Sequence, residues 1–150
     1  MTVEVVLVNT NRLRPPVAPL ALDYLADVLR AQEISVRLVD LCWETDLQAA
    51  IAAALAQSRP TLVGLTLRNT DDCYLASGQD FVPEFARLVH LVRSHTEAPV
   101  VLGGSGYSVF PESMLTAMGA DYGIVGDGEL ALTMLAAELA SNRQVWRVPG

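Results

Sequence analysis

Two glycine-rich segments, each directly after a short apolar run, constrain the fold of this chain more than any other feature. Residues 100–102 are followed by Gly-Gly-Ser-Gly, and residues 122–125 by Gly-Asp-Gly-Glu. The length and β-branching of both apolar runs predict buried strands. Small residues after a strand let a ligand approach the backbone closely, because no Cβ intervenes. Two such strand ends on one edge of an open α/β sheet predict a ligand site at that edge.

The rest of the chain alternates between strand and helix patterns. Strands are predicted at residues 3–8, 36–41, 62–67, 100–102 and 122–125, and a helix pattern follows each of them. Asp46 is expected to cap the second helix. Alternation of this kind predicts an α/β fold with a parallel sheet, helices on both faces and right-handed crossovers. We expect a flavodoxin-like, Rossmann-type sheet of five strands in the order 2-1-3-4-5.

Composition narrows the class of protein. The chain has 150 residues, 51% of them hydrophobic, which suits one folded domain over residues 1–150. A net charge of −7 disfavours nucleic acid or an anionic membrane as the main partner. All ten basic residues are arginine, so lysine chemistry is excluded. Cys42 and Cys73 form no disulfide or metal pattern, and no leader or membrane-spanning run is evident, so we expect a cytoplasmic protein.

Several chemistries do not fit the sequence. The loop after the first strand, residues 9–19, holds three prolines and no glycine, which excludes a flavin phosphate loop there. A phosphoryl-receiver domain would need clustered carboxylates after the first strand and a lysine late in the chain, and both are missing. An ordinary methyltransferase would need its glycine loop after the first strand, whereas here the glycine loop follows the fourth. A three-cysteine iron–sulfur motif is absent.

Residues 141–150 lack periodicity and end in Val-Pro-Gly, which favours a chain cut at a domain boundary.

Each candidate site residue has a structural alternative. The loop at residues 103–108 could be only a tight turn, but its three glycines and two serines favour a ligand. The loop at residues 126–129 alone would be weak evidence; paired with the first, it suggests the other wall of one crevice. Arg68 follows a buried strand and either pairs with Asp71 or Asp72 or faces the ligand. His90 lies on the predicted helix that precedes the fourth strand, and His95 lies at the end of that helix. Both are away from the edge of the sheet where the ligand is expected.

The two glycine loops resemble those of the N-terminal cobalamin-binding domains of B12-dependent radical S-adenosylmethionine (SAM) enzymes. Residues 16–26, Pro-Val-Ala-Pro-Leu-Ala-Leu-Asp-Tyr-Leu-Ala, are similar to their first loop and helix, with Ala21 where glycine is usual. Residues 65–72, Leu-Thr-Leu-Arg-Asn-Thr-Asp-Asp, resemble a branch that includes tryptophan 2-C-methylating enzymes. The resemblance covers nearly the whole chain and implies a radical SAM domain in cis, with its 4Fe-4S cluster and SAM, in a part that this sequence lacks.

The resemblance implies cobalamin at the carboxyl ends of the strands. The nucleotide tail would lie beside the glycine loops, where a side chain at Gly104 would enter its path, and the corrin would lie above residues 9–14 and 68–72. Thr66 and Ser105 would offer hydroxyl groups to the tail. The cofactor-binding residues so implied are Asn9, Thr10, Thr66, Arg68, Asn69, Gly103, Gly104, Ser105, Gly106, Tyr107, Ser108, Gly126, Asp127, Gly128 and Glu129.

Histidine is missing from the loop after the first strand, where related corrinoid domains carry the cobalt ligand. The resemblance therefore implies base-off binding without a histidine ligand, and Arg68 beneath the corrin would not coordinate cobalt, because guanidinium stays protonated. The implied function is to carry cobalamin for a radical SAM methyltransferase, which passes a methyl group from SAM through methylcobalamin to a substrate. The domain alone is expected to have no turnover. The alternative is a non-catalytic, flavodoxin-like binding or sensor module for another nucleotide-like ligand.

Overall fold

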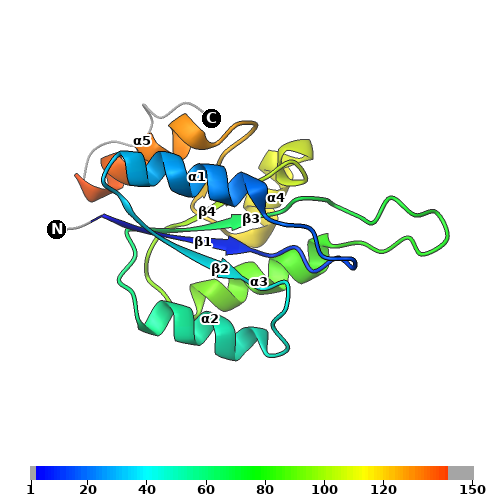
Figure 1. Ribbon diagram of the computed structural model, residues 1–150. Helices are drawn as coiled ribbons and strands as arrows, with labels where there is room; N and C mark the ends of the chain where they lie inside the picture. Colours follow the sequence, from blue (N-terminus) through cyan, green and yellow to red (C-terminus); the bar gives the residue numbers. More distant parts are fainter. Residues whose placement is uncertain (1–2, 142–150) are drawn as a thin grey trace.

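The computed structural model, described over residues 3–141, is a five-stranded parallel sheet with helices on both faces (Figure 1). The strand order is β2-β1-β3-β4-β5, so the predicted 2-1-3-4-5 topology is confirmed. The interpretation of residues 141–150 as the end of a chain cut at a domain boundary falls, beyond residue 141, outside the described residues. The strands are β1 (Glu4–Asn9), β2 (Ser35–Asp40), β3 (Leu62–Thr66), β4 (Val100–Gly103) and β5 (Tyr122–Gly123), and the helices are α1 (Leu20–Ala31), α2 (Leu47–Ala56), α3 (Val82–Arg93), the short 3-10 turn η1 (Tyr107–Val109), α4 (Pro111–Met118) and α5 (Glu129–Ala140).

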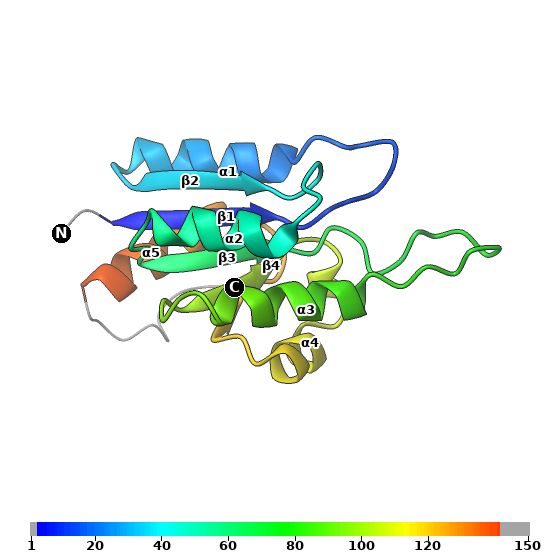
Figure 2. The ribbon, with the colours of Figure 1, turned by 90° about the horizontal axis from the view of Figure 1, so that it is seen from below.

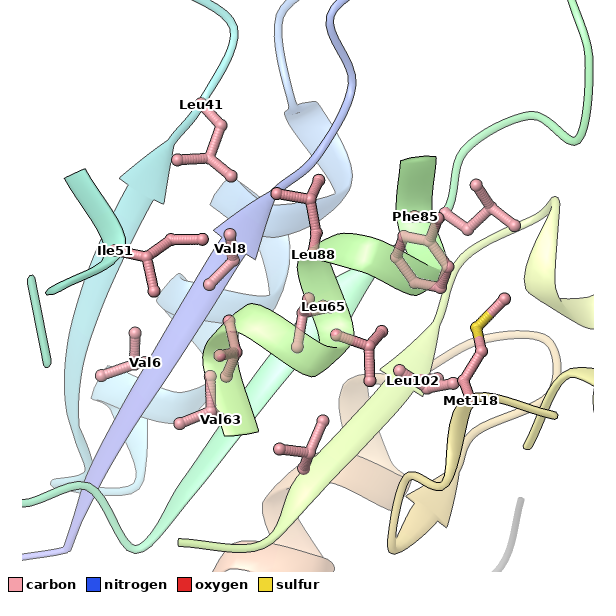
Figure 3. Close-up of a cluster of buried hydrophobic side chains, with 14 of the residues drawn as sticks. Val6, Val8, Leu41, Ile51, Val63, Leu65, Phe85, Leu88, Leu102 and Met118 are labelled. Atoms are coloured by element: carbon pink, nitrogen blue, oxygen red, sulfur yellow. The ribbon is translucent and has the colours of Figure 1, made fainter. Parts of the chain in front are cut away.

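The sheet separates two apolar cores because successive strand side chains point to opposite faces. Val6, Val8 and Leu65 face α2, α3 and α4, where they pack with buried residues such as Phe85 and Met118 (Figure 3). On the other face, residues of β1, β3 and β4 pack against α1 and α5; this cluster contains Val5, Leu7, Leu22, Leu29, Leu62, Val101, Ile124, Leu132 and Leu135. The central strands are therefore buried on both sides, as their continuous apolar sequence predicts.

Helix starts follow local sequence signals. Asp46 caps α2, since its Oδ1 accepts a hydrogen bond from the Ala49 N–H at 2.9 Å. Proline occupies the first turn of α3 and of α4, where a missing N–H costs nothing. Gly119 ends α4 with φ +62°, a left-handed conformation that glycine adopts without a Cβ penalty. No helix in the described range 3–141 is long and apolar enough to cross a membrane.

The last strand is shorter than predicted. β5 covers only two residues, whereas the apolar run extends to Val125. The Ile124 N–H still donates to the Leu102 carbonyl oxygen at 2.8 Å, but Val125 is exposed and Gly126 has φ +78°. The chain therefore leaves the sheet early, and this turn places the second glycine loop beside the first.

Residues 70–81 form an arm that projects from the carboxyl end of the sheet (Figures 1 and 2). Asp71 and Asp80 form an antiparallel bridge at its base, and the Phe81 N–H donates to the Thr70 carbonyl oxygen at 2.8 Å. Hydrogen bonds between its two sides give the arm a defined, hairpin-like path.

Candidate functional site

A cavity of about 480 Å³, here called the slot, opens at the carboxyl end of the sheet between α1 and α5. Its floor is formed by β1, β3 and β4, and the two glycine loops border its mouth. The volume lies within the range of small-molecule and cofactor sites. The residues that line it are Leu7, Ala21, Leu22, Leu25, Gly64, Leu65, Thr66, Val101, Leu102, Gly103, Gly104, Ser105, Ser108, Ile124, Gly126, Asp127, Gly128, Glu129 and Leu132.

The slot exists because its floor and one wall lack side chains at several positions. A Cβ added to Gly103 would meet only the Ile124 carbonyl oxygen, at 3.8 Å, and one added to Gly126 would meet nothing within 4 Å. Gly128 packs against Leu25, with 3.3 Å from an added Cβ to the nearest leucine methyl. Gly103 and Gly126 therefore leave open the space that a flat, bulky group would need.

Gly104 has a different role from the one the sequence suggested. Its φ is +101°, and an added Cβ would lie 2.5 Å from the Leu67 carbonyl oxygen and 2.6 Å from Thr66 Oγ1. A side chain at Gly104 would thus collide with the end of β3. The expectation that it would enter the path of a bound tail is wrong, although the Gly104 backbone does line the slot.

Hydroxyl groups hold the loops of the slot together. Ser108 Oγ donates to the Gly104 carbonyl oxygen at 3.0 Å and accepts from the Gly126 N–H at 3.0 Å, so it joins the two glycine loops. Ser105 Oγ donates to the Arg68 carbonyl oxygen at 2.7 Å. Thr10 Oγ1 donates to the Thr66 carbonyl oxygen at 2.6 Å. The loops after β1, β3, β4 and β5 are therefore joined into one rim.

A second cavity of about 580 Å³, here called the edge basin, lies beside this rim. Thr10, Arg68 and Asn69 line it. Arg12 spans one side, with Nη1 3.0 Å from Glu84 Oε1 and Nη2 donating to the Glu44 carbonyl oxygen at 3.2 Å. The basin thus presents guanidinium and amide groups next to the carboxyl end of the sheet.

Arg68 is exposed in the edge basin, and no ion pair within residues 3–141 joins it to Asp71 or Asp72. Those carboxylates accept local hydrogen bonds instead. The backbone N–H of Cys73 is the main group that lowers the pKa of Asp71, and the Ser77 hydroxyl is the main one that lowers the pKa of Asp72. Within residues 3–141 the structure therefore lacks the alternative considered for Arg68, a salt bridge to either aspartate.

Three predicted site residues lie outside both cavities. Asn9 is 3% exposed; its Nδ2 donates to Asp40 Oδ1 at 2.8 Å and its Oδ1 accepts from the Asn11 N–H at 3.1 Å. Tyr107 is 1% exposed in the core, where burial raises the pKa of its phenol. Gly106 packs against the backbone of Asn69, with 2.9 Å from an added Cβ to its carbonyl carbon. These residues shape the rim from within.

The structure adds apolar slot residues that the sequence reasoning missed, chiefly Leu25, Gly64, Val101, Ile124 and Leu132. Gly64 was the detectable signal, because a glycine inside a buried strand often marks a close approach by another group. An added Cβ there would lie 2.9 Å from a Leu7 methyl. The wall residues from α1 and α5 carried no such signal, since core leucines and slot leucines have the same helical spacing.

The fold and the slot define an α/β domain with a cofactor-sized cavity at the carboxyl end of its sheet. A family model described as the B12 binding domain matches residues 6–136. The chain therefore belongs to the B12-binding-domain family, and cobalamin is the cofactor that defines this family. The predicted resemblance is confirmed.

Individual relatives agree with this assignment. The chain is 37% identical over 145 residues to tryptophan 2-C-methyltransferase from Streptomyces laurentii, covering 96% of this chain and 24% of that protein. It superimposes with a TM-score of 0.96, at 37% identity, on the radical SAM methyltransferase TsrM from Kitasatospora setae with cobalamin and a [4Fe-4S] cluster bound, covering 100% of this chain and 27% of that one. The cobalamin-dependent SAM radical enzyme OxsB, at 21% identity and a TM-score of 0.80, covers 99% of this chain and 20% of that one and supports the fold alone. The chain spans about a quarter of the length of the first two relatives.

Proposed function

We propose that this chain binds cobalamin base-off and carries it for a radical SAM methyltransferase. The proposal depends on the slot, because this cavity lies at the carboxyl end of the sheet and is bordered by glycine backbone without side chains. The 37% identity to TsrM, a radical SAM methyltransferase, supports the same assignment. The radical SAM part, with its cluster and SAM, would belong to the remaining three quarters of such a protein.

The residues present fit the cofactor. The slot would take the nucleotide tail against Gly103 and Gly126, where an added Cβ would enter open space. Thr66 lies at the mouth and would offer its hydroxyl group to the tail, whereas Ser105, whose proton goes to the Arg68 carbonyl oxygen, would only accept a hydrogen bond there. The corrin would lie over the rim, near Thr10 and Asn69. Cobalamin, when bound, supplies a cobalt centre that accepts and donates a methyl group.

The chain offers no histidine for the lower face of the cobalt. Its two histidines are His90 and His95, on the last turn of α3 and just after it. α3 begins near the carboxyl end of the sheet and leads to the start of β4, so both histidines lie at the opposite end from the rim. This arrangement supports base-off binding without a histidine ligand.

Arg68 is the residue that we place under the corrin. It follows β3, a central strand, and lines the edge basin. Its guanidinium cannot act as a ligand because it stays protonated. A fixed positive charge at this position would disfavour a lower ligand and the more positive states of cobalt, and would ease transfer of the methyl group to an acceptor.

Direct binding tests the proposal. We expect the purified chain, mixed with cobalamin and passed through a desalting column, to retain about one equivalent and to show the visible spectrum of the base-off cofactor. Cobinamide, which lacks the nucleotide tail, should be held more weakly because it leaves the slot empty. A folded chain that elutes without cobalamin, or that holds it base-on, would contradict the proposed function.

Arg68→Ala should change the bound cofactor's spectrum. Without the guanidinium, water can approach the cobalt from below, so the visible bands should shift toward those of a form with a lower ligand. The matched control is Arg59→Ala, since Arg59 is also exposed but precedes β3 at the opposite end of the sheet. If Arg68→Ala retains the parental spectrum and affinity, Arg68 is a surface residue with no role beneath the corrin.

A further inference from the structure

The slot is polar at its mouth and apolar at depth. Thr66 ends β3, Ser105 and Ser108 lie between β4 and α4, Asp127 lies between β5 and α5, and Glu129 begins α5. The deeper lining is apolar: Leu7 and Val101 lie two residues before the ends of β1 and β4, and Leu22, Leu25 and Leu132 lie in the first or second turns of α1 and α5. Every described lining residue before Thr66 on β3, before Gly103 on β4 or after Glu129 on α5 is glycine or apolar.

The hydroxyl groups at the mouth are largely committed to the protein. Ser108 Oγ donates to Gly104 and accepts from Gly126, and the proton of Ser105 Oγ goes to the Arg68 carbonyl oxygen. The backbone groups of the floor pair within the sheet, because β1, β3 and β4 run in continuous register. A polar group at the bottom of the slot would therefore lack hydrogen-bond partners.

This polarity distinguishes between corrinoids that differ in the lower base. The base is the free end of the nucleotide tail, so a tail that enters from the mouth places its base deepest. Dimethylbenzimidazole presents a hydrocarbon ring and methyl groups. Adenine, the base of pseudocobalamin, presents an amino group and several ring nitrogens, and buried polar groups without partners are costly.

We propose that the slot selects corrinoids with an apolar lower base, benzimidazole or phenol in type, over those with a purine base. The inference rests on the proposed function, because it assigns the tail to the slot. Coordination of the lower base to cobalt in the free corrinoid has the opposite effect on affinity. Dimethylbenzimidazole must leave the cobalt before it enters the slot, which weakens the binding of cobalamin. Adenine coordinates cobalt only weakly, so pseudocobalamin loses less. A measured preference for cobalamin would therefore arise in the slot.

Three corrinoids separate these contributions. Cobalamin has an apolar base that can coordinate cobalt, p-cresolylcobamide has an apolar base without a nitrogen, and pseudocobalamin has a polar base. We expect the chain to bind both corrinoids with apolar bases at least about tenfold more tightly than pseudocobalamin, measured by absorbance or calorimetric titration at the same pH and salt. Equal affinities, or tighter binding of pseudocobalamin, would overturn the inference and leave the proposed function intact. Failure to bind any of the three would overturn both.

A matched pair of variants assigns the preference to the wall. Leu25 is half-buried, lines the slot and packs against Gly128, whereas Leu130 is 65% exposed on α5 and lies outside the lining. Leu25→Gln brings an amide to the wall with little loss of helix propensity. The ratio of the pseudocobalamin to the cobalamin dissociation constant should fall several-fold in Leu25→Gln and stay at the parental value in Leu130→Gln. An unchanged ratio in a folded Leu25→Gln variant would show that this wall does not read the base.

Discussion

Gly103→Val is expected to weaken cobalamin binding by roughly 100-fold, the upper range of the cost of overpacking a filled site. Gly103 ends β4 on the face that lines the slot, two residues after Val101. An added Cβ would meet only the Ile124 carbonyl oxygen, at 3.8 Å, and the backbone does not have a positive φ. Valine suits a strand and can be built there without collision. Its methyl groups would occupy the space that we assign to the tail.

The measurement is an absorbance titration of the variant beside its thermal unfolding curve. Gly103→Ala should give an intermediate affinity because it removes less of the cavity. Ala137→Val is the control, since Ala137 is exposed on α5 and outside the slot lining. If Gly103→Val melts like the parent and binds cobalamin equally well, then the tail does not lie in the slot.

The topology could be predicted from the sequence because the apolar runs alternate with helical spacing. Five such runs in 150 residues leave few right-handed parallel arrangements. The short β5 could not be predicted in this way. Val125 has the apolar, β-branched character of a strand residue, but Gly126 turns the backbone away at φ +78°. A glycine after an apolar run does not indicate how many of the preceding residues still form hydrogen bonds with the neighbouring strand.

Part of the candidate site was also predictable. The glycine loops lie together as expected, and Ser108 joins them through its hydroxyl group. Tyr107 was placed at the site because it lies between Gly106 and Ser108 in sequence. The 3-10 turn rotates its ring into the core instead, against Gly123, where an added Cβ would lie 1.7 Å from the phenol oxygen. Sequence spacing gives the position of a loop but not which of its side chains point inward.

Neighbouring glycines also conceal different physical roles. Gly103 and Gly104 look equivalent in the sequence, yet one leaves space for a ligand and the other leaves space for the protein itself. The difference arises because the loop after β4 lies against the end of β3, a segment about 37 residues earlier in the chain. The hydrogen bond from Ser105 Oγ to the Arg68 carbonyl oxygen holds the two loops together. Only the paired strands bring these segments into contact.

Gly104→Ala is accordingly expected to destabilise the fold, by about 2–4 kcal/mol. Alanine would be strained at φ +101°, and its Cβ would lie 2.5 Å from the Leu67 carbonyl oxygen. That oxygen cannot withdraw easily, because it accepts a hydrogen bond from the Gly106 N–H at 2.9 Å. The free energy of unfolding, measured with urea and compared with the parent, gives the cost.

Gly119→Ala separates backbone strain from collision. Gly119 has φ +62° but nothing within 4 Å of an added Cβ, so its substitution by alanine carries the conformational cost without the close contact. We expect it to cost about 1 kcal/mol, the typical penalty for alanine in a left-handed cap. The excess loss in Gly104→Ala then measures the contact between the loops after β3 and β4. If both variants lose the same stability, the loop at Gly104 relaxes away from Leu67, and its tight apposition to β3 contributes nothing to the fold.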